Sequence, residues 1–481
     1  MILLAIVTIP LAVAVLSAFF RSQRLASAMT FMAAVAILGL SAGAALNIIT
    51  SPNHLLVAIP HWLALDALSA VILLLVAVVN LTAALFSMGY MHFRDPGGVR
   101  RYYLNYNLFV FSMLLVPLIQ EPSLVWVAVE LTTVFSVLLV GFEDTQEALE
   151  AAWKYVVLTI MGAAIALFGF LMLYWAARQA DVPHHTWSGL LAVAPQMSPV
   201  LLKAAFVFIL VGLGAKIGLV PLHTWLPDAH SQAPTPVCAL LSGVETTTVL
   251  YVILRLLPVV SQAPAIHAHT WILAFGLISV GTAAFLLINV RDYKRLFAFS
   301  TVEHMGIIMA AAGLGGASAH AAAMLQIIAH SFTKSFCFYT AGGLLLEMRT
   351  RDISSVRGLI RREPFTASAL LLGGLAIAGA PPFALFLSEF SILRAGLNRG
   401  QYLAAGLLVI FIAIAFSAIM NHISRMVFGP DEGGGSLRSG SLPLSCKITL
   451  IIAAIPVIVL GIYIPGALQK LIALAAAVIG G

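Results

Sequence analysis

Long apolar stretches separated by short polar segments recur along the whole chain of 481 residues. Windows of this kind, about 18 or more residues long, can cross a bilayer as helices. We predict about fourteen such transmembrane helices, at 2–20, 25–48, 63–90, 104–119, 123–142, 151–176, 199–220, 236–260, 268–290, 295–313, 318–346, 364–397, 402–427 and 445–476. The pattern therefore predicts an all-α polytopic membrane protein.

Prolines interrupt two of these spans. The seventh carries Lys216 and then breaks at Pro221, and the twelfth is interrupted at Pro381 and Pro382. A proline removes a helical hydrogen bond. Broken backbone at membrane depth is tolerated only where it is packed in protein or lines a cavity. The broken helices 7 and 12 therefore mark candidate functional positions.

Spans four to eight and nine to thirteen have the same layout, with the break in the fourth helix of each set. An odd number of helices per copy forces opposite orientations, so we predict two inverted five-helix repeats. The predicted regions are 1–100 with the first three helices, 104–260 and 268–430 with the two repeats, and 445–481 with the last helix. The glycine-rich segment 431–441 is predicted to be a loop.

Composition and charge agree with a membrane protein. Hydrophobic residues make up 61% of the chain and charged residues 9%, which excludes a soluble domain of this length. Most basic residues lie between spans. An outside N-terminus places sixteen Lys and Arg on the inner side and five on the outer side, so both termini are predicted outside. The inner set is Arg21, Arg24, Arg94, Arg100, Arg101, Arg291, Lys294, Arg295, Arg349, Arg351, Arg357, Arg361, Arg362, Arg425, Arg438 and Lys447.

Ionisable residues inside the spans are the candidate chemistry, because charge at membrane depth is costly and is usually functional. Glu130 lies in the fifth span and Lys216 in the seventh. Opposite charges buried together stabilise each other's ionised forms, and separating them releases both towards neutrality. We predict that they form a pair that loads protons. The alternative is a static ion pair that fixes helix packing.

Further candidates lie in the second repeat. His330 precedes Lys334 by one helical turn, and Glu389 follows the break in the twelfth span, which suggests a relay and an exit carboxylate. The weaker candidates, each also compatible with a structural role such as hydrogen bonding, capping or ion pairing, are Lys154, His223, Glu245, Glu303 and His304.

Enzyme motifs are missing from the sequence. It has no phosphate loop, dinucleotide fingerprint or nucleophile elbow. Its three cysteines are far apart and form neither a CxxC pair nor an iron–sulfur framework. We therefore expect no catalytic residue, no cofactor and no metal site in this chain.

Three segments carry a family resemblance: GLGAKIGLVPLHTWLPDAHSQAPTPVCALLSGV, RDYKRLFAFSTVEHMG and MLQIIAHSFTKSFCFYTAG. With them, residues 60–430 resemble the antiporter-like subunits of respiratory complex I, Mrp antiporters and membrane-bound hydrogenases. The resemblance implies that Glu130 and Lys216 are the proton-loading pair. It also implies that Lys334 is the central lysine, with His330 nearby, and that Glu389 is the terminal residue.

The segments EALEAAWKYVVLTIMGAAIALFG and AGAPPFALFLSEF resemble the component F subgroup of hydrogenase-4 and formate hydrogenlyase-type complexes. The resemblance implies a proton-translocating subunit of a redox-driven complex in a bacterial or archaeal plasma membrane. Its expected partners are other antiporter-like subunits and a peripheral redox arm. A nickel–iron centre, iron–sulfur clusters or quinone are expected only in those partners.

Three alternatives stay open: an antiporter-like subunit of complex I, an Mrp-type sodium/proton antiporter subunit, and a purely structural membrane anchor. The eighth span also departs from the family. Ser242 and Thr247 stand where many complex I members have a histidine and a lysine. The link between Lys216 and Lys334 is therefore unassigned, with Glu245 or water as substitutes.

Overall fold

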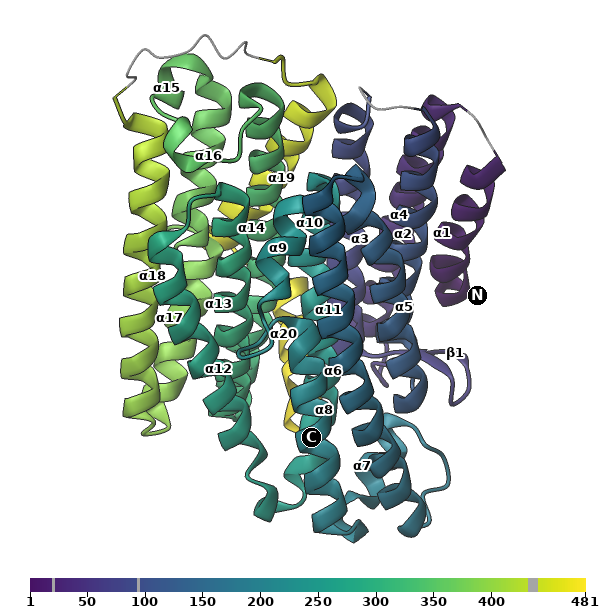
Figure 1. The fold of residues 1–481 in the computed structure, drawn as a ribbon. Coiled ribbons are helices and arrows are strands. Elements are labelled where there is room, and N and C mark those ends of the chain that lie inside the picture. The colour runs from purple at the N-terminus through teal and green to yellow at the C-terminus, as the bar shows by residue number, and fades with distance from the viewer. Residues whose placement is uncertain (20–21, 93–95, 431–439) are drawn as a thin grey trace.

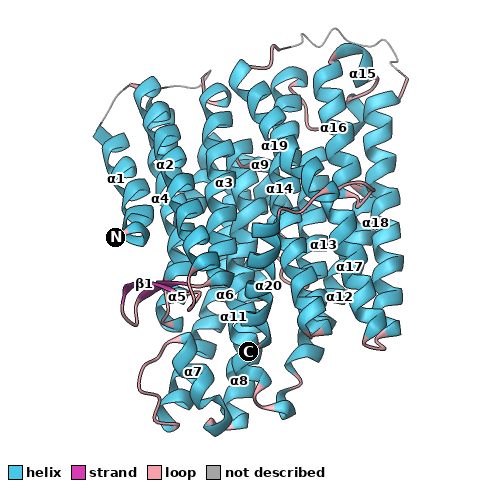
Figure 2. Ribbon diagram, turned by 180° about the vertical axis from the view of Figure 1, so that it is seen from behind, coloured by secondary structure: helices cyan, strands magenta, loops and turns pink. Residues whose placement is uncertain are grey.

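The structure, a computed structural model, describes residues 1–19, 22–92, 96–430 and 440–481. Figures 1 and 2 show a bundle of long helices that run roughly parallel to one another. Within the described ranges, eleven helices are long and apolar enough to cross a membrane, judged by length and composition. The predicted all-α polytopic membrane fold is confirmed. The number fourteen and the inverted repeats stay predictions.

The first part of the bundle comprises α1 (Ile2–Phe19), α2 (Gln23–Thr50), β1 (Leu56–Ile59), β2 (Leu63–Leu65), α3 (Ala67–Tyr90), α4 (Pro96–Leu115), α5 (Pro122–Val140), α6 (Gln146–Gln179), α7 (Trp187–Val193), α8 (Pro199–Ile217), α9 (Trp225–Gln232), α10 (Thr235–Leu240) and α11 (Thr246–Ser261). A π-helical turn, Leu241–Glu245, joins α10 to α11.

The second part comprises α12 (Ala268–Leu286), α13 (Tyr293–Leu314), α14 (Ala317–Met348), α15 (Leu359–Arg362), α16 (Pro364–Ile377), α17 (Ala384–Asn398), α18 (Tyr402–Phe428), α19 (Leu444–Ile462) and α20 (Gly466–Gly480). Arg21, Arg94 and Arg438 of the inner-side count, and residues 431–439 of the predicted loop, lie outside the described residues.

Both broken helices are present. Helix α8 ends one residue after Lys216, where Gly218 takes a left-handed conformation with φ of 87° and its N–H bonds to the Gly214 carbonyl. Helix α16 ends at Ile377, and α17 starts at Ala384. Gly379 has φ of 76° in that break, and a Cβ there would collide with the Glu389 carboxylate. Each break therefore brings irregular backbone next to an ionisable side chain.

Two predicted spans are wrong in detail. The third was predicted from residue 63, but residues 63–65 form β2, and α3 begins after Asp66, whose side chain accepts from the Ser69 N–H at 3.0 Å. The last was predicted as one helix over 445–476. The structure divides it into α19, which ends at Ile462, and α20, which begins at Gly466 after the N-cap residue Pro465.

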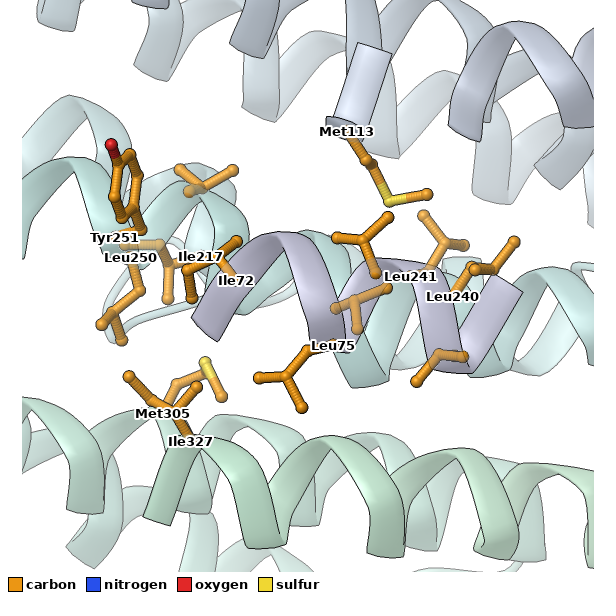
Figure 3. Packing of buried hydrophobic residues seen from close by; sticks show 14 of the residues in the cluster. Ile72, Leu75, Met113, Ile217, Leu240, Leu241, Leu250, Tyr251, Met305 and Ile327 are labelled. Atoms are coloured by element: carbon orange, nitrogen blue, oxygen red, sulfur yellow. The ribbon is translucent and has the colours of Figure 1, made fainter. Parts of the chain in front are cut away.

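One hydrophobic cluster runs through the centre of the bundle. Figure 3 shows a part of it, in which Leu75 of α3, Leu241 of the π-helical turn and Ile327 of α14 are buried. The most hydrophobic window of α10 and α11 is entirely buried, and that of α13 is 94% buried. Polar side chains on these interior helices are therefore shielded from lipid.

Candidate functional site

Ionisable side chains collect on the interior helices and beside the two breaks. Among those exposed by 6% or less are Lys216, Glu245, Glu303, His304, His330, Lys334 and Glu389. Charged groups taken out of water need partners. The contacts of these side chains therefore determine which of them can hold or pass a proton.

Lys216 pairs with Glu245. The Lys216 Nζ lies 3.4 Å from the Glu245 Oε1, and the ammonium also donates to the Thr133 hydroxyl. The same carboxylate oxygen accepts from Thr132 Oγ1 at 2.9 Å and from the Tyr155 hydroxyl at 3.3 Å. Three donors around one oxygen suit an ionised carboxylate. Sequence reasoning had placed Glu245 only among the weaker candidates.

Glu130 lies in the predicted span, but the predicted direct contact with Lys216 is not made by it. It lies in the middle of α5 and is half-buried, and its Oε1 has no hydrogen-bond partner among the described residues. It interacts electrostatically with both Lys216 and Glu245, yet the direct contact with the lysine belongs to Glu245. Glu130 is thus a neighbour of the Lys216–Glu245 pair and acts on it through longer-range electrostatics.

The π-helical turn connects this pair to the second set of charges. In the turn, the Thr246 N–H bonds to the Leu241 carbonyl, five residues earlier. Glu245, at the end of the turn, faces Lys216, whereas the Ser242 carbonyl meets His330 Nε2 at 3.1 Å. The Ser242 hydroxyl also lies 2.7 Å from Thr301 Oγ1 on α13. One turn of helix therefore contacts both Lys216 and His330, the residue one helical turn before Lys334.

Lys334 and His330 lie on α14, as predicted, and both are fully buried. The Lys334 ammonium donates to the Phe297 carbonyl and to the Ser300 hydroxyl of α13. The His330 ring lies 5.5 Å from the His304 ring, measured between centroids. His330 is therefore the member of the pair that contacts the π-helical turn and approaches His304.

His304 leads on to Glu389. Its Nδ1 lies 3.9 Å from Glu389 Oε1 and 3.1 Å from Gln326 Nε2, and its Nε2 lies 3.2 Å from the Ile377 carbonyl. The Ser388 hydroxyl donates to Gln326 Oε1. The two helices that flank the break, α16 and α17, thus supply a carbonyl and the carboxylate to this cluster.

Sequence reasoning missed Gln326 and Ser388. A neutral polar side chain inside a span usually makes structural hydrogen bonds, so neither residue stood out. The available signal was spacing: Gln326 lies one helical turn before His330, and Ser388 directly precedes Glu389.

Two helix irregularities fix the tautomers of the histidines. A carbonyl oxygen can only accept a hydrogen bond, so the nitrogen that faces it carries the proton. His304 and His330 both direct Nε2 at a main-chain carbonyl. In the neutral rings Nδ1 is therefore the basic atom. Within the described chain, His330 Nδ1 has no hydrogen-bond partner.

The remaining weaker candidates do not contact the series of buried side chains that runs from Lys216 to Glu389. Lys154 is 46% exposed and pairs with Glu150 at 2.7 Å and Asp228 at 3.1 Å. His223 lies between α8 and α9, and its Nδ1 is buried without a partner in the described ranges. Glu303 Oε2 likewise has none there. The structure therefore places Glu245 and His304 in this series of buried side chains and leaves Lys154 at a charged surface.

A cavity of about 880 Å³ opens beside the C-terminal ends of α3 and α14. Glu143, Glu147, Lys294, Arg349 and Arg351 are among its lining residues. We call it the vestibule. The Lys294 ammonium, only 1% exposed, donates to the Ala233 carbonyl between α9 and α10 at 2.7 Å. The vestibule therefore lies beside the junction of α9 and α10.

Metal ligands are sparse in the part of the chain that the structure describes. No group of three or more His, Cys, Asp or Glu side chains there could hold a metal ion. Cys238, Cys337 and Cys446 are separate, buried and unbridged.

Comparisons with known proteins agree with this architecture. The family described as NADH:quinone oxidoreductase/Mrp antiporter, TM, matches residues 121–416. Another, described as NADH-Ubiquinone oxidoreductase (complex I), chain 5 N-terminus, matches residues 56–103. A hydrogenase-4 component F homolog of Methylacidiphilum infernorum (isolate V4) is 40% identical over 83% of this chain and 85% of that protein.

Two solved structures share the fold. A chain of the membrane-bound sulfane sulfur reductase, an archaeal respiratory membrane complex, superposes with a TM-score of 0.88 at 22% identity. The match covers 99% of this chain and 98% of that one. A chain of the Mrp complex from Dietzia sp. DQ12-45-1b gives 0.87 at 18% identity, over 100% and 97% of the two chains.

Proposed function

Because the chain belongs to the family of antiporter-like membrane subunits shared by NADH:quinone oxidoreductases and Mrp antiporters, we propose that it translocates protons within a redox-driven membrane complex. The observation that carries the proposal is the interior line of ionisable side chains. It runs from Lys216 and Glu245 across the π-helical turn to His330, and then through His304 to Glu389.

Transport begins at the Lys216–Glu245 pair. Two buried opposite charges hold each other ionised, and separating them favours transfer of a proton from the ammonium. Breaking such a pair costs about 3–5 kcal/mol, so the opening needs an energy source outside this chain. Electron transfer in partner subunits supplies that energy.

The proton then crosses the π-helical turn to His330 and His304. Neutral imidazoles accept at Nδ1, and bound water carries the proton over gaps longer than one hydrogen bond. Lys334 beside His330 sets the electrostatic cost of charging that imidazole. Glu389 receives the proton and releases it at the opposite side. The vestibule supplies protons from the predicted inner side.

The complex type that we favour is that of hydrogenase-4 or formate hydrogenlyase, on the strength of the component F relative. In that setting the chain lies in a bacterial or archaeal plasma membrane, with both termini outside. It contacts other antiporter-like subunits and a peripheral redox arm. That arm, rather than this chain, carries the nickel–iron centre, iron–sulfur clusters or quinone. Co-purification of a nickel–iron hydrogenase large subunit tests this assignment.

A sodium/proton antiporter subunit is the second candidate, because the matching family joins quinone oxidoreductases and Mrp antiporters in one description. It predicts transport that depends on sodium and needs no redox substrate. An antiporter-like subunit of complex I shares the proposed mechanism but differs in the electron donor. Transport assays with and without sodium, driven by hydrogen, formate or NADH, separate the three.

The central test is removal of the Lys216 charge. In the intact complex reconstituted in vesicles, Lys216→Met should abolish coupled proton transport while the complex still assembles. Lys203→Met is the matched control, because Lys203 lies on the same helix but is exposed. We expect the control to transport protons at the rate of the unmodified complex. Unchanged transport by Lys216→Met would refute the proposal and favour a structural anchor.

A further inference from the structure

Gln326 links the last histidine of the line to the helix of the last carboxylate. It is fully buried on α14, between His304 of α13 and Ser388 of α17. Its Nε2 meets His304 Nδ1 at 3.1 Å, and its Oε1 accepts from the Ser388 hydroxyl. Ser388 directly precedes Glu389, whose Oε1 lies 3.9 Å from the same imidazole nitrogen.

We propose that the Gln326 amide is a two-state hydrogen-bond switch that allows His304 to take up and release a proton, and so controls proton passage from His330 to Glu389. The inference rests on the proposed function and deepens it. Gln326 acts here as a positioning residue, because it exchanges hydrogen bonds and carries no proton itself.

The first state has a neutral His304. Its Nε2–H donates to the Ile377 carbonyl, so the Nδ1 lone pair is free to accept. The Gln326 amide donates Nε2–H to that lone pair, and its carbonyl oxygen accepts from Ser388. The only basic atom of His304 is thereby capped, and an incoming proton must first displace the amide N–H.

The second state has a protonated His304, in which Nδ1 also becomes a donor. The amide then turns over, so that Oε1 accepts from Nδ1–H and Nε2–H faces the Ser388 oxygen. Ser388 can accept this bond because its own proton has other acceptors within α17, the Leu385 carbonyl at 2.9 Å and the Ala384 carbonyl at 3.2 Å. In both states the two imidazole nitrogens, the amide oxygen, one amide N–H and the Ser388 hydroxyl therefore each have a partner.

Several charged or titratable groups surround His304 and bias the switch. Glu389 of α17 approaches Nδ1, and His330 of α14 stacks obliquely on the ring. Lys334 of α14 is a further charged group that interacts electrostatically with the ring. Glu303, the preceding residue on α13, interacts with Lys334 and Glu389. A side chain at position 326 that could only donate or only accept a hydrogen bond would hold His304 in one protonation state.

The test uses the complete complex in vesicles, with coupled proton transport measured as a function of pH. Gln326→Leu removes the acceptor for protonated His304, so the optimum should move to lower pH. Gln326→Glu holds His304 protonated by a carboxylate, so the optimum should move to higher pH. Each should lower transport at the original optimum by about tenfold or more, through loss of a charge-assisted hydrogen bond in Gln326→Leu and through trapping of the proton on His304 in Gln326→Glu.

Two further variants separate the switch from simple packing. Gln326→His can both donate and accept, and should retain at least half of the transport. Ser388→Ala removes one hydrogen bond from each state, and should lower transport without moving the optimum. Gln401→Leu is the matched control, because the Gln401 side chain donates to the Leu314 carbonyl at the end of α13.

Equal losses in Gln326→Leu and Gln326→Glu without opposite shifts would overturn the switch, as would unchanged transport in Gln326→Leu. If Gln326→Glu prevents assembly, the shift in Gln326→Leu and the rescue in Gln326→His decide the matter. The proposed function fails separately: it falls if Lys216→Met transports normally. If Lys216→Met loses proton transport and Gln326→Leu transports normally, only the proposed switch is refuted.

Discussion

Lys216 takes its counter-charge from Glu245, which the sequence placed only among the weaker candidates. The sequence predicted Glu130, because a carboxylate in the middle of a neighbouring span is the expected partner of a buried lysine. In the structure Glu245 makes that contact, and Glu130 is half-buried on α5 without touching the lysine. The two carboxylates therefore have separable roles, contact for one and longer-range electrostatics for the other.

Glutamine substitutions should distinguish the two carboxylates. Glu245→Gln leaves a buried ammonium without its paired charge, which costs about 3–5 kcal/mol unless Lys216 loses its proton. We expect coupled proton transport to fall to background. Glu130→Gln should cause a partial loss, because it removes only an indirect interaction. Transport rates of both variants, normalised to assembled complex, provide the measurement. Full transport in Glu245→Gln with none in Glu130→Gln would restore the original pairing.

The sequence could predict the residues that carry charge and could not predict how they connect. Lys334, His330 and Glu389 were identified because ionisable groups are rare in apolar spans, and all three are buried in the interior. Gln326 and Ser388 were missed because neutral polar residues occur in spans for many reasons. Their importance lies in which atoms they meet across three helices, and that is a property of packing.

At the scale of the element, the π-helical turn is the structural device that joins the two halves of the line. It presents Glu245 to Lys216 and the Ser242 carbonyl to His330. Gly243 lies between them, and a Cβ at this position would come within 3.2 Å of the Ser331 carbonyl on α14. The glycine therefore allows the turn to approach α14 closely.

Gly243→Ala should weaken transport by forcing the turn away from α14. Overpacking of this kind typically costs about 1–3 kcal/mol, and here the strain falls on the contact between Ser242 and His330. Gly39→Ala is the matched control, because a Cβ on Gly39 would have no neighbour within 4 Å. We expect a reduced transport rate and thermal stability in the first variant and neither change in the second. Equal behaviour of the two would argue against a role for the close approach.

The helix breaks and the π-helical turn differ in how far sequence could anticipate them. The prolines after Lys216 and before Glu389 announced the breaks. The turn at Leu241–Glu245 has no such residue, because one extra residue in a helical turn is decided by tertiary contacts. The break between α19 and α20 could have been read from Pro465, but the surrounding apolar pattern was continuous enough to suggest one helix.

For the molecule as a whole, the charged vestibule defines one end of the bundle. Glu147 lines it and is exposed, whereas Ser188 of α7 is exposed at the opposite end, where Figure 1 shows α7 far from α15. The predicted orientation places the vestibule inside and α7 outside. The distribution of Lys and Arg along the sequence predicts this orientation, although it could not show a cavity.

Cysteine labelling should establish the orientation. A membrane-impermeant thiol reagent added outside intact cells should modify Ser188→Cys and leave Glu147→Cys unmodified, and inverted vesicles should give the reverse. The three native cysteines are buried, so the unmodified chain provides the background signal. Labelling of Glu147→Cys from outside would invert the topology and with it the direction of proton uptake.

The two carbonyls that fix the histidine tautomers belong to the main chain, and this limits what genetics can reveal. Every amino acid at positions 242 and 377 keeps that oxygen, so a complete substitution scan would report on side chains and stay blind to two of the three hydrogen bonds described for the His304 and His330 rings. An amide-to-ester replacement of the bond that follows Ser242 would weaken the oxygen as an acceptor without altering any side chain. Backbone chemistry, more than mutagenesis, is the means of reaching this part of the relay.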